Sequence, residues 1–266
     1  MSLPTLFVSH GSPMLAKDPG ATGAAWQRMA AELPKPRAIV IASAHWMTQY
    51  PVVSTATAPV TIHDFYGFPE SLYRLGYEAH GAPAVAEQVA ARIHAAGMRV
   101  GVDPARGLDH GAWVPLRSMY PQADVPVFQL AIQPRETPGH HYQVGRALAG
   151  LGEEGVLVLA SGSMTHNLRD LQPNLADGTA GNDYVTAFAE WMHEKLLGRD
   201  IGALLDYRRR APHAQCAHPT DEHLLPLYVA LGAAGDNVDA LRWHQDITAG
   251  GLSMDAYRFD RTQSLH

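Results

Sequence analysis

Short apolar runs alternate with longer segments of helical periodicity along most of this chain. Four of the apolar runs are rich in β-branched residues and predict strands, at 3–8, 37–43, 125–132 and 156–161. Continuous apolar runs of this length are typical of strands that are buried on both faces. The segments with helical spacing predict helices at 20–33, 83–97, 138–151, 182–198 and 221–233. Pro83 and Pro138 both stand where a first helical turn tolerates proline.

The alternation of these elements predicts an α/β domain with a central, mostly parallel or mixed sheet and helices on both faces. Residues 238–243 and 251–259 predict two further strands late in the chain. No Ser/Gly-rich linker, charge block or internal repeat divides the sequence. We therefore expect residues 1–266 to form a single domain.

Three of the four predicted strands end close to a histidine. His10 follows the first strand, His45 the second, and His166 the fourth after a short connection. Because ligands of open α/β sheets bind outside the carboxyl ends of the strands, we expect an active site at this edge, with these imidazoles converging there. His223, with Glu222 beside it, is a further candidate donor at the predicted start of helix 221–233.

The chemistry of such a cluster points to a transition metal. A single histidine at a strand end is more often a hydrogen-bonded structural residue than a ligand, but three similar placements make metal binding an equal alternative. Neutral imidazole is the commonest metal-binding side chain, and a histidine set suits Zn or Fe(II) rather than Mg or Ca. The spacing alone does not choose between these two metals.

Two turn-rich loops carry further candidates for a pocket. In one, His63 and Asp64 precede Phe65, Tyr66 and Phe68, a combination typical of the wall of a pocket for a flat ligand. The alternative for this segment is a well-packed loop without a ligand.

The second loop, at 107–113, places Asp109 beside His110, and a well-packed loop is the alternative there too. The other nine histidines lack such surroundings and are expected to be surface or structural residues: His80, His94, His140, His141, His193, His213, His218, His244 and His266.

Composition narrows the class of protein. The 266 residues include 15 His against 20 Lys and Arg, with a formal net charge of -6. There is no basic footprint, so we expect neither nucleic acid nor a membrane surface as a partner. Cys216 is the one cysteine, which excludes an internal disulfide framework. With no recognisable secretory signal or membrane span, we expect a cytoplasmic monomer or small homo-oligomer.

Motifs for other chemistries are absent or misplaced. The glycine pattern at 150–155 precedes a predicted strand instead of following one, so it does not predict a dinucleotide site. The sequence contains no P-loop, no H-E-x-x-H helix and no G-x-S-x-G elbow.

Six short motifs, in this order, carry a resemblance to a known family: His10-Gly-Ser-Pro, Ser43-Ala-His45-Trp46, Ile62-His-Asp-Phe-Tyr-Gly-Phe-Pro69, Leu108-Asp-His-Gly-Ala-Trp113, Ser161-Gly-Ser-Met-Thr-His-Asn-Leu168 and Pro219-Thr-Asp-Glu-His-Leu-Leu-Pro226. From about residue 4 to 258 the chain resembles the class III extradiol ring-cleavage dioxygenases of the LigB-type superfamily, most of all the DOPA 4,5-dioxygenase branch. The resemblance implies a single catalytic domain that opens a catechol ring with O₂ to a semialdehyde, using non-haem Fe(II) and no organic cofactor.

Carried over by position, the resemblance implies metal ligands at His10, His45 and His223. Glu222 is the reserve ligand, because the wider superfamily uses two histidines and one carboxylate. His166 matches the acid/base histidine and is itself a reserve ligand.

His110 is a second expected catalytic histidine, which together with His63 would hydrogen-bond oxygen or substrate. The aromatic side chains at 65, 66 and 68 are expected to flank the ring, with Asp64 beside them in the substrate-binding set.

Two alternatives remain open at this point. The same cluster could bind Zn(II) and form hydroxide from water, as in a zinc-dependent hydrolase. It could also belong to a binding protein whose metal site is structural or vestigial.

Overall fold

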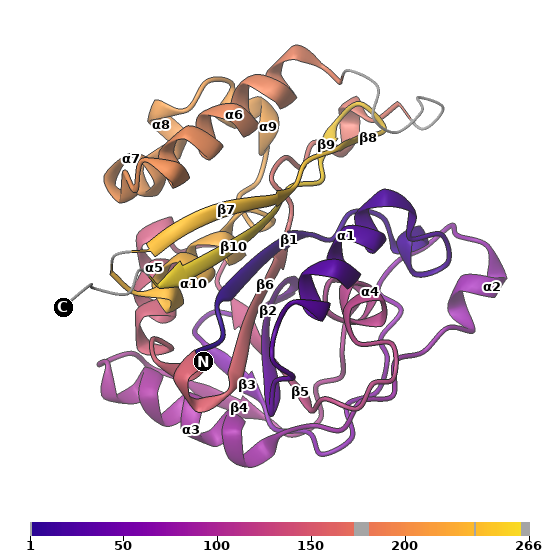
Figure 1. Cartoon of the computed structure of the whole chain (residues 1–266), viewed down its shortest axis with the longest axis vertical. Coiled ribbons are helices and arrows are strands. Elements are labelled where there is room, and N and C mark those ends of the chain that lie inside the picture. Colours follow the sequence, from indigo (N-terminus) through magenta and orange to yellow (C-terminus); the bar gives the residue numbers. More distant parts are fainter. Residues whose placement is uncertain (1, 173–180, 237, 262–266) are drawn as a thin grey trace.

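A large mixed sheet forms the centre of the computed structural model, which describes residues 2–172, 181–236 and 238–261 (Figure 1). In the order in which they pair, its eight strands are β4 (Gly101–Asp103), β3 (Val52–Ser54), β5 (Val127–Ile132), β2 (Ala38–Met47), β6 (Val156–Gly162), β1 (Thr5–Ser9), β10 (Ala256–Arg261) and β7 (Val238–His244). A separate two-stranded ribbon pairs β8 (Ile247–Thr248) with β9 (Leu252–Ser253).

The four central strands run parallel and end at the same edge. Strand β1 pairs with β6 from Thr5 opposite Val158 to Ser9 opposite Gly162, and β2 pairs in parallel with both β6 and β5. Strands β10 and β7 add to one side in antiparallel fashion, and β3 lies antiparallel to β5 on the other. The predicted α/β fold with a mixed sheet is therefore confirmed.

Helices cover both faces of the sheet (Figure 1). They are α1 (Gly20–Ala31), α2 (Glu70–Tyr73), α3 (Pro83–Ala95), α4 (His110–Met119), α5 (Pro138–Ala147), α6 (Asp183–Leu197), α7 (Ile201–Leu205), α8 (Tyr207–Arg210), α9 (Ala214–Ala217) and α10 (Leu225–Ala234), with the short 3-10 turns η1 (Pro13–Ala16), η2 (Leu151–Glu154) and η3 (Leu168–Asp170).

Alternate residues of the central strands explain why both faces are buried. On β1, Leu6 and Val8 pack in one core with Trp26 of α1 and Trp113 of α4. Phe7 points to the opposite face and packs in the core that contains α6 and α10. A parallel strand with helices on both sides needs apolar residues at every position, which is the pattern that its sequence shows.

Several predicted boundaries need correction. Strand β2 continues to Met47 through a register shift after Ser43, so His45 lies within the strand rather than after it. The predicted helix 138–151 is interrupted, because Gly150 takes a left-handed backbone conformation between α5 and η2. The predicted strand 251–259 is divided into β9 and β10.

Two further corrections concern candidate site residues. The loop expected around His110 is the first turn of α4, where Asp109 caps the helix by accepting a hydrogen bond from the amide of Ala112. His223 does not start a helix, since α10 begins at Leu225, next to Pro226. None of the helices in the described part of the chain is long and apolar enough to span a bilayer.

Candidate metal centre

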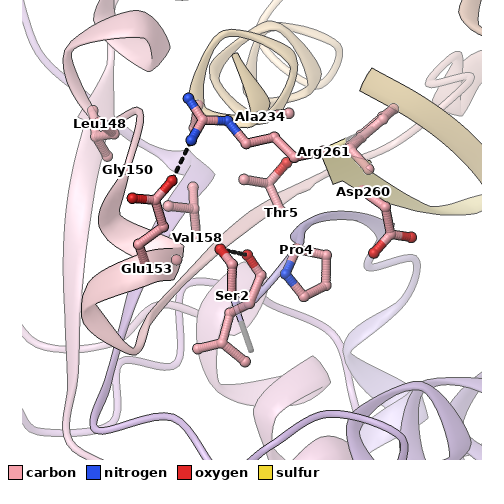
Figure 2. Close-up of a pocket in the computed structure, with 14 residues that line it drawn as sticks. Ser2, Pro4, Thr5, Leu148, Gly150, Glu153, Val158, Ala234, Asp260 and Arg261 are labelled. Atoms are coloured by element: carbon pink, nitrogen blue, oxygen red, sulfur yellow. Dashed lines mark hydrogen bonds and ion pairs between the residues drawn. The ribbon is translucent and has the colours of Figure 1, made fainter. Parts of the chain in front are cut away.

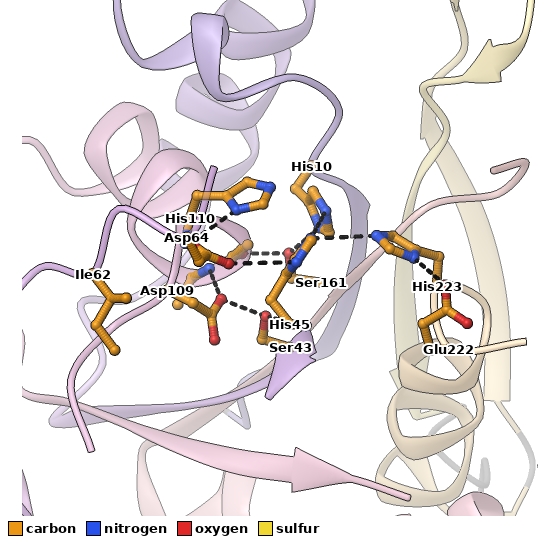
Figure 3. A network of polar contacts seen from close by, with 12 residues as sticks. His10, Ser43, His45, Ile62, Asp64, Asp109, His110, Ser161, Glu222 and His223 are labelled. Atoms are coloured by element: carbon orange, nitrogen blue, oxygen red, sulfur yellow. Dashed lines mark hydrogen bonds and ion pairs between the residues drawn. The ribbon is translucent and has the colours of Figure 1, made fainter. Parts of the chain in front are cut away.

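Four of the predicted histidines meet at the carboxyl edge of the sheet. His10 directly follows β1, His45 lies near the end of β2, and His166 lies four residues beyond the end of β6. His223 comes from the turn before α10 and approaches from the side opposite His110 (Figure 3).

A close backbone contact brings His223 to this edge. The amide of Ser163 donates a hydrogen bond of 2.8 Å to the His223 carbonyl. A Cβ at Gly162 would lie only 2.0 Å from the same carbonyl oxygen, so only glycine permits this approach. The tip of β6 thereby holds the turn that carries the fourth histidine.

Three imidazole Nε2 atoms converge on one point. The Nε2 of His45 lies 3.0 Å from the Nε2 of His10 and 3.3 Å from the Nε2 of His223. Donor atoms of His10, His45 and His110 also lie within 4.8 Å of one another. All of these rings are buried or half-buried.

The Nδ1 atom of each of the three rings faces an oxygen. His10 Nδ1 lies 3.0 Å from Ser161 Oγ, whose own hydrogen is donated to the carbonyl of Gly111, so the serine oxygen accepts from the ring. His223 Nδ1 lies 3.1 Å from Glu222 Oε1. His45 Nδ1 faces Asp64 Oδ2 at 3.4 Å.

These contacts assign the protons of the rings. The Nδ1 atoms of His10 and His223 donate to an oxygen and that of His45 faces a carboxylate, so each Nε2 is left with a lone pair. The Nε2 of His45 lies close to both of the others. Lone pairs that face one another at 3.0–3.3 Å repel, and a cation between them removes the repulsion. In metal sites, an oxygen that accepts from the second ring nitrogen of a histidine orients its imidazole toward the metal. The Nδ1 contacts of these three histidines follow that arrangement, so the donor set fits a transition metal.

Burial keeps the rings neutral and available as donors. It is the largest cause that lowers the pKa of His10 and His223 well below the ordinary value, and neighbouring imidazoles lower it further. For His45, burial lowers the pKa to about 4, although Asp109 and Asp64 act in the opposite direction. A neutral imidazole is the form that binds a metal.

His166 occupies a distinct place beside the three converging rings. Its ring stacks on His223 with centroids 3.4 Å apart and planes 8° apart. Its backbone amide donates to the carbonyl of Ala217, and burial lowers the pKa of the side chain to about 4. Donor atoms of His166, Glu222 and His223 lie within 4.8 Å of one another.

His110 and Asp64 form the opposite wall. The His110 amide donates to Asp64 Oδ1 at 2.9 Å, and the His110 Nδ1 lies 3.0 Å from the same oxygen. Burial favours the neutral carboxyl, but the contacts with His110 outweigh it and lower the pKa of Asp64 to about 2. The resulting carboxylate links His110 to His45, whose ring centroids are 3.9 Å apart.

A cavity of about 450 Å³ opens onto these rings. Among the predicted substrate-binding residues, Phe65 and Phe68 line it. The structure does not place His63 or Tyr66 on its wall: His63 Nε2 faces the carbonyl of Leu75 at 2.9 Å, and the Tyr66 side chain is 90% exposed. Asp64 contacts histidines rather than the cavity, as described above.

Comparison with known proteins agrees with this geometry. Residues 4–253 match the family model of the catalytic LigB subunit of aromatic ring-opening dioxygenases. The chain belongs to this family. It is 41% identical to the "4,5-DOPA dioxygenase extradiol" of Beta vulgaris over 97% of each chain, and 37% identical to the protein of that name from Escherichia coli K12, over 95% of this chain and 93% of the relative.

The fold is shared with a solved structure as well. A crystal structure of an uncharacterized Escherichia coli K12 protein superposes with a TM-score of 0.79 and 31% identity, covering 96% of this chain and 99% of that one. The chain is thus a metal-dependent extradiol dioxygenase, and its reaction consumes a small aromatic substrate and O₂.

The dioxygenase also contains supporting residues that sequence reasoning missed. The fully buried carboxylate of Asp109 accepts hydrogen bonds from Ser43 at 2.6 Å, Gln129 at 2.8 Å and Arg106 at 2.7 Å. The Ser43 Oγ in turn accepts from the amide of His45 at 3.2 Å. The acid beside His110 was visible in the sequence, but its partners were not.

The role of Gly111 is likewise not apparent from the sequence. A Cβ there would meet Ser43 Oγ at 2.6 Å and His45 Cδ2 at 3.1 Å. The absence of a side chain lets the first turn of α4 approach His45, and the Gly111 carbonyl receives the hydrogen of Ser161. The same turn therefore supports both His10 and His45.

Proposed function

We propose that this dioxygenase binds Fe(II) through His10, His45 and His223 and opens the ring of a DOPA-like catechol. The observation that carries the proposal is the convergence of the three Nε2 atoms, each with its Nδ1 facing an oxygen acceptor. A triad of protein ligands on one face leaves positions for the two catechol oxygens and for O₂. Glu222, the reserve ligand, is better placed as the acceptor behind His223.

Bound Fe(II) would relay electrons from the closed-shell catechol to triplet O₂, so that the catechol is the species oxidised, whereas Zn(II) has no redox chemistry. We assign the proton transfers to His166. Its neutral imidazole can accept the proton of a catechol hydroxyl as substrate binds and return it when the ring opens, a role worth about 10²–10⁴ in rate. Its stacking on His223 fixes the ring close to the proposed ligands.

We assign His110 a hydrogen bond to O₂ or to a substrate oxygen. Its ring lines the cavity beside His10 and His45, with Asp64 fixing its orientation. Phe65 and Phe68, whose ring centroids lie 5.3 Å apart, form the aromatic wall against which the catechol ring would lie.

The remaining features of the proposal concern the whole chain. We propose that residues 1–266 form one catalytic domain that acts as a cytoplasmic monomer or small homo-oligomer. The net charge of -6 does not favour nucleic acid or an anionic membrane as a partner.

Anaerobic reconstitution tests the proposal. The apoprotein is loaded with Fe(II) or, as the matched control, with Zn(II), and is then given DOPA and O₂. We expect equimolar O₂ uptake and a yellow ring-opened product with Fe(II), and neither with Zn(II). No O₂ uptake with any catechol, together with ester or amide hydrolysis by the Zn(II) form, would instead support the zinc hydrolase.

A further inference from the structure

The pairing of strand β2 does not by itself fix the position of His45. The register of β2 against β5 is regular up to Ser43 and then shifts before Met47. On the other side of β2, the pairing with β6 ends at Ser43 as well. Residues 44–46 therefore bulge out of the ladder, and bulges are common beside active sites because they redirect a side chain. Contacts other than the strand ladder hold His45 in place.

One of these contacts leads from the main chain of His45 to a buried carboxylate. The His45 amide donates to Ser43 Oγ at 3.2 Å, and Ser43 Oγ donates its hydrogen to Asp109 Oδ1 at 2.6 Å (Figure 3). Ser43 and Asp109 are both fully buried. The Ser43 side chain thus ties the bulge in β2 to Asp109.

The same carboxylate oxygen holds the helix that begins at His110. Asp109 Oδ1 also accepts from the Ala112 amide at 3.2 Å and thereby caps α4. The bulge that carries His45 and the first turn of α4 therefore share one acceptor atom. Because the ring centroids of His45 and His110 are only 3.9 Å apart, the position of this oxygen affects the spacing of the two rings.

The second oxygen of Asp109 is anchored to the sheet and to a cation. Asp109 Oδ2 accepts from Gln129 Nε2 at 2.8 Å and from Arg106 Nη2 at 2.7 Å. The Asp109 amide donates back to Gln129 Oε1 at 3.1 Å, so Asp109 and this residue of β5 are paired reciprocally. Arg106 in turn lies over the ring of Trp46, 5.2 Å from its centroid. These contacts leave the carboxylate little freedom to move.

We infer that Asp109 is a positioning residue for ring cleavage, which sets the spacing between His45 and His110. The inference rests on the proposed function, in which His45 binds the metal and His110 hydrogen-bonds O₂ or a substrate oxygen. Removing a group that supports a metal ligand from behind typically lowers metal affinity or activity about 10–100-fold, and we expect effects of this size.

The first test breaks the link to His45 and leaves the cap of α4 in place. For Ser43→Ala, affinity for Fe(II) is measured by competition with a chelator, and the visible spectrum of the Co(II)-loaded protein reports the donor geometry without turnover. We expect the affinity and kcat each to fall about 10–100-fold and the spectrum to change. Thr5→Val removes a buried hydrogen bond to the carbonyl of Ala230, at the other end of β1, and is the matched control that should change none of the three.

A double substitution tests Asp109 itself. In Asp109→Asn, an amide group that donates replaces an oxygen that accepts from Gln129 and Arg106, so donors face donors. Metal affinity and kcat should fall at least as far as in Ser43→Ala. Adding Gln129→Glu supplies acceptor oxygens to the new amide and keeps one negative charge beside Arg106, so the double variant should recover about tenfold in each measurement.

The outcomes separate this inference from the proposed function. Unchanged metal affinity, Co(II) spectrum and kcat in Ser43→Ala would overturn the inference and leave catechol cleavage in place, and this variant decides if Asp109→Asn does not fold. A double variant that regains unfolding free energy but not metal affinity would also overturn it. If the unmodified Fe(II) protein took up no O₂, but Ser43→Ala still weakened metal binding and changed the Co(II) spectrum, the proposed reaction would be wrong and the positioning of His45 would stand.

Discussion

Two cavities of nearly equal size lie at opposite ends of the same strands. The one at the carboxyl edge has a volume of about 450 Å³ and is lined by His10, which follows β1. The other, of about 460 Å³, lies at the amino end, where Thr5 begins β1 and Val158 belongs to β6 (Figure 2). Volume therefore does not distinguish the active site from the second hollow.

The polar groups of the two cavities differ in their partners. At the amino end Arg261 pairs with Glu153, and Thr5 Oγ1 donates to the carbonyl of Ala230 at 3.0 Å. At the carboxyl end the Nε2 of His45 faces the Nε2 atoms of His10 and His223, at 3.0 and 3.3 Å. Ring nitrogens that face one another, instead of a hydrogen-bond donor, therefore distinguish the carboxyl-edge cavity as the one with metal-binding chemistry.

The largest effect should follow from removing one of the converging rings. His45→Ala deletes the Nε2 that lies nearest to both other proposed ligands, so we expect iron content close to zero and no measurable O₂ uptake. Metal analysis after reconstitution measures the loss. Glu153→Ala, in the opposite cavity, is the control and should retain full iron. Undiminished iron in His45→Ala would refute the assigned ligand.

The next largest effect should be on turnover alone. His166→Gln removes the proposed acid/base while leaving the three converging Nε2 atoms in place, so kcat should fall about 10²–10⁴-fold with most of the iron retained. Single-turnover kinetics and metal analysis on the same sample separate the two effects. Full activity would exclude His166 from proton transfer, and loss of iron would make it a ligand.

A smaller effect should follow from weakening a support behind the site. Glu222→Gln keeps an oxygen near His223 Nδ1 but removes the negative charge, so metal affinity should fall about 10–100-fold. Competition with a chelator measures the affinity. Glu153→Gln makes the same chemical change at the other end and should have no effect. A complete loss of metal in Glu222→Gln would indicate direct ligation instead.

Much of this arrangement was predictable because the residues that form a strand and those that follow it are neighbours in the sequence. The apolar runs located β1, β2 and β6, and the histidines after them identified the edge at which they would meet. The oxygen contacts of the Nδ1 atoms were not predictable. That Ser161 lies behind His10 depends on the register of β1 against β6, which places residues 151 positions apart side by side.

The interpretation of the sequence was wrong where two local signals favoured different structures. Pro115 and the glycines around His110 favour a loop, but the Asp109 cap and the packing of Trp113 make the segment a helix. In the same way Asp64 stands among aromatic residues that suggested a pocket wall, and it contacts His45 and His110 instead. Such outcomes depend on tertiary partners that a single sequence does not reveal.

A buried histidine outside the site tests whether burial alone explains the difference between the two ends. His141 is 1% exposed, but its Nε2 accepts from the amide of Gln133 and its Nδ1 faces the carbonyl of Thr137. Burial lowers its pKa from 6.5 to about 4. The unfolded chain thus binds the proton more tightly, and stability should fall as the pH drops from 6.5 towards 4.

Replacing this residue should therefore change acid stability and not the metal site. Between pH 7 and pH 5, the unfolding free energy of the unmodified protein should decrease by about 2 kcal/mol more than that of His141→Gln, measured by urea unfolding. Iron content and kcat should remain unchanged. Loss of iron in this variant would show that burial, rather than an open Nε2, marks the functional histidines.

The smallest effect should come from the amino-end cavity itself. Arg261 and Glu153 are about half exposed, and exposed ion pairs contribute at most about 1 kcal/mol, so Arg261→Met should change the unfolding free energy by less than that. Its kcat, KM and iron content should match those of the unmodified protein. A marked change in KM for a catechol would mean that this cavity communicates with the carboxyl edge. If KM does not change, the chemistry of the protein is confined to the carboxyl ends of the parallel strands, and the amino-end cavity has only a structural role.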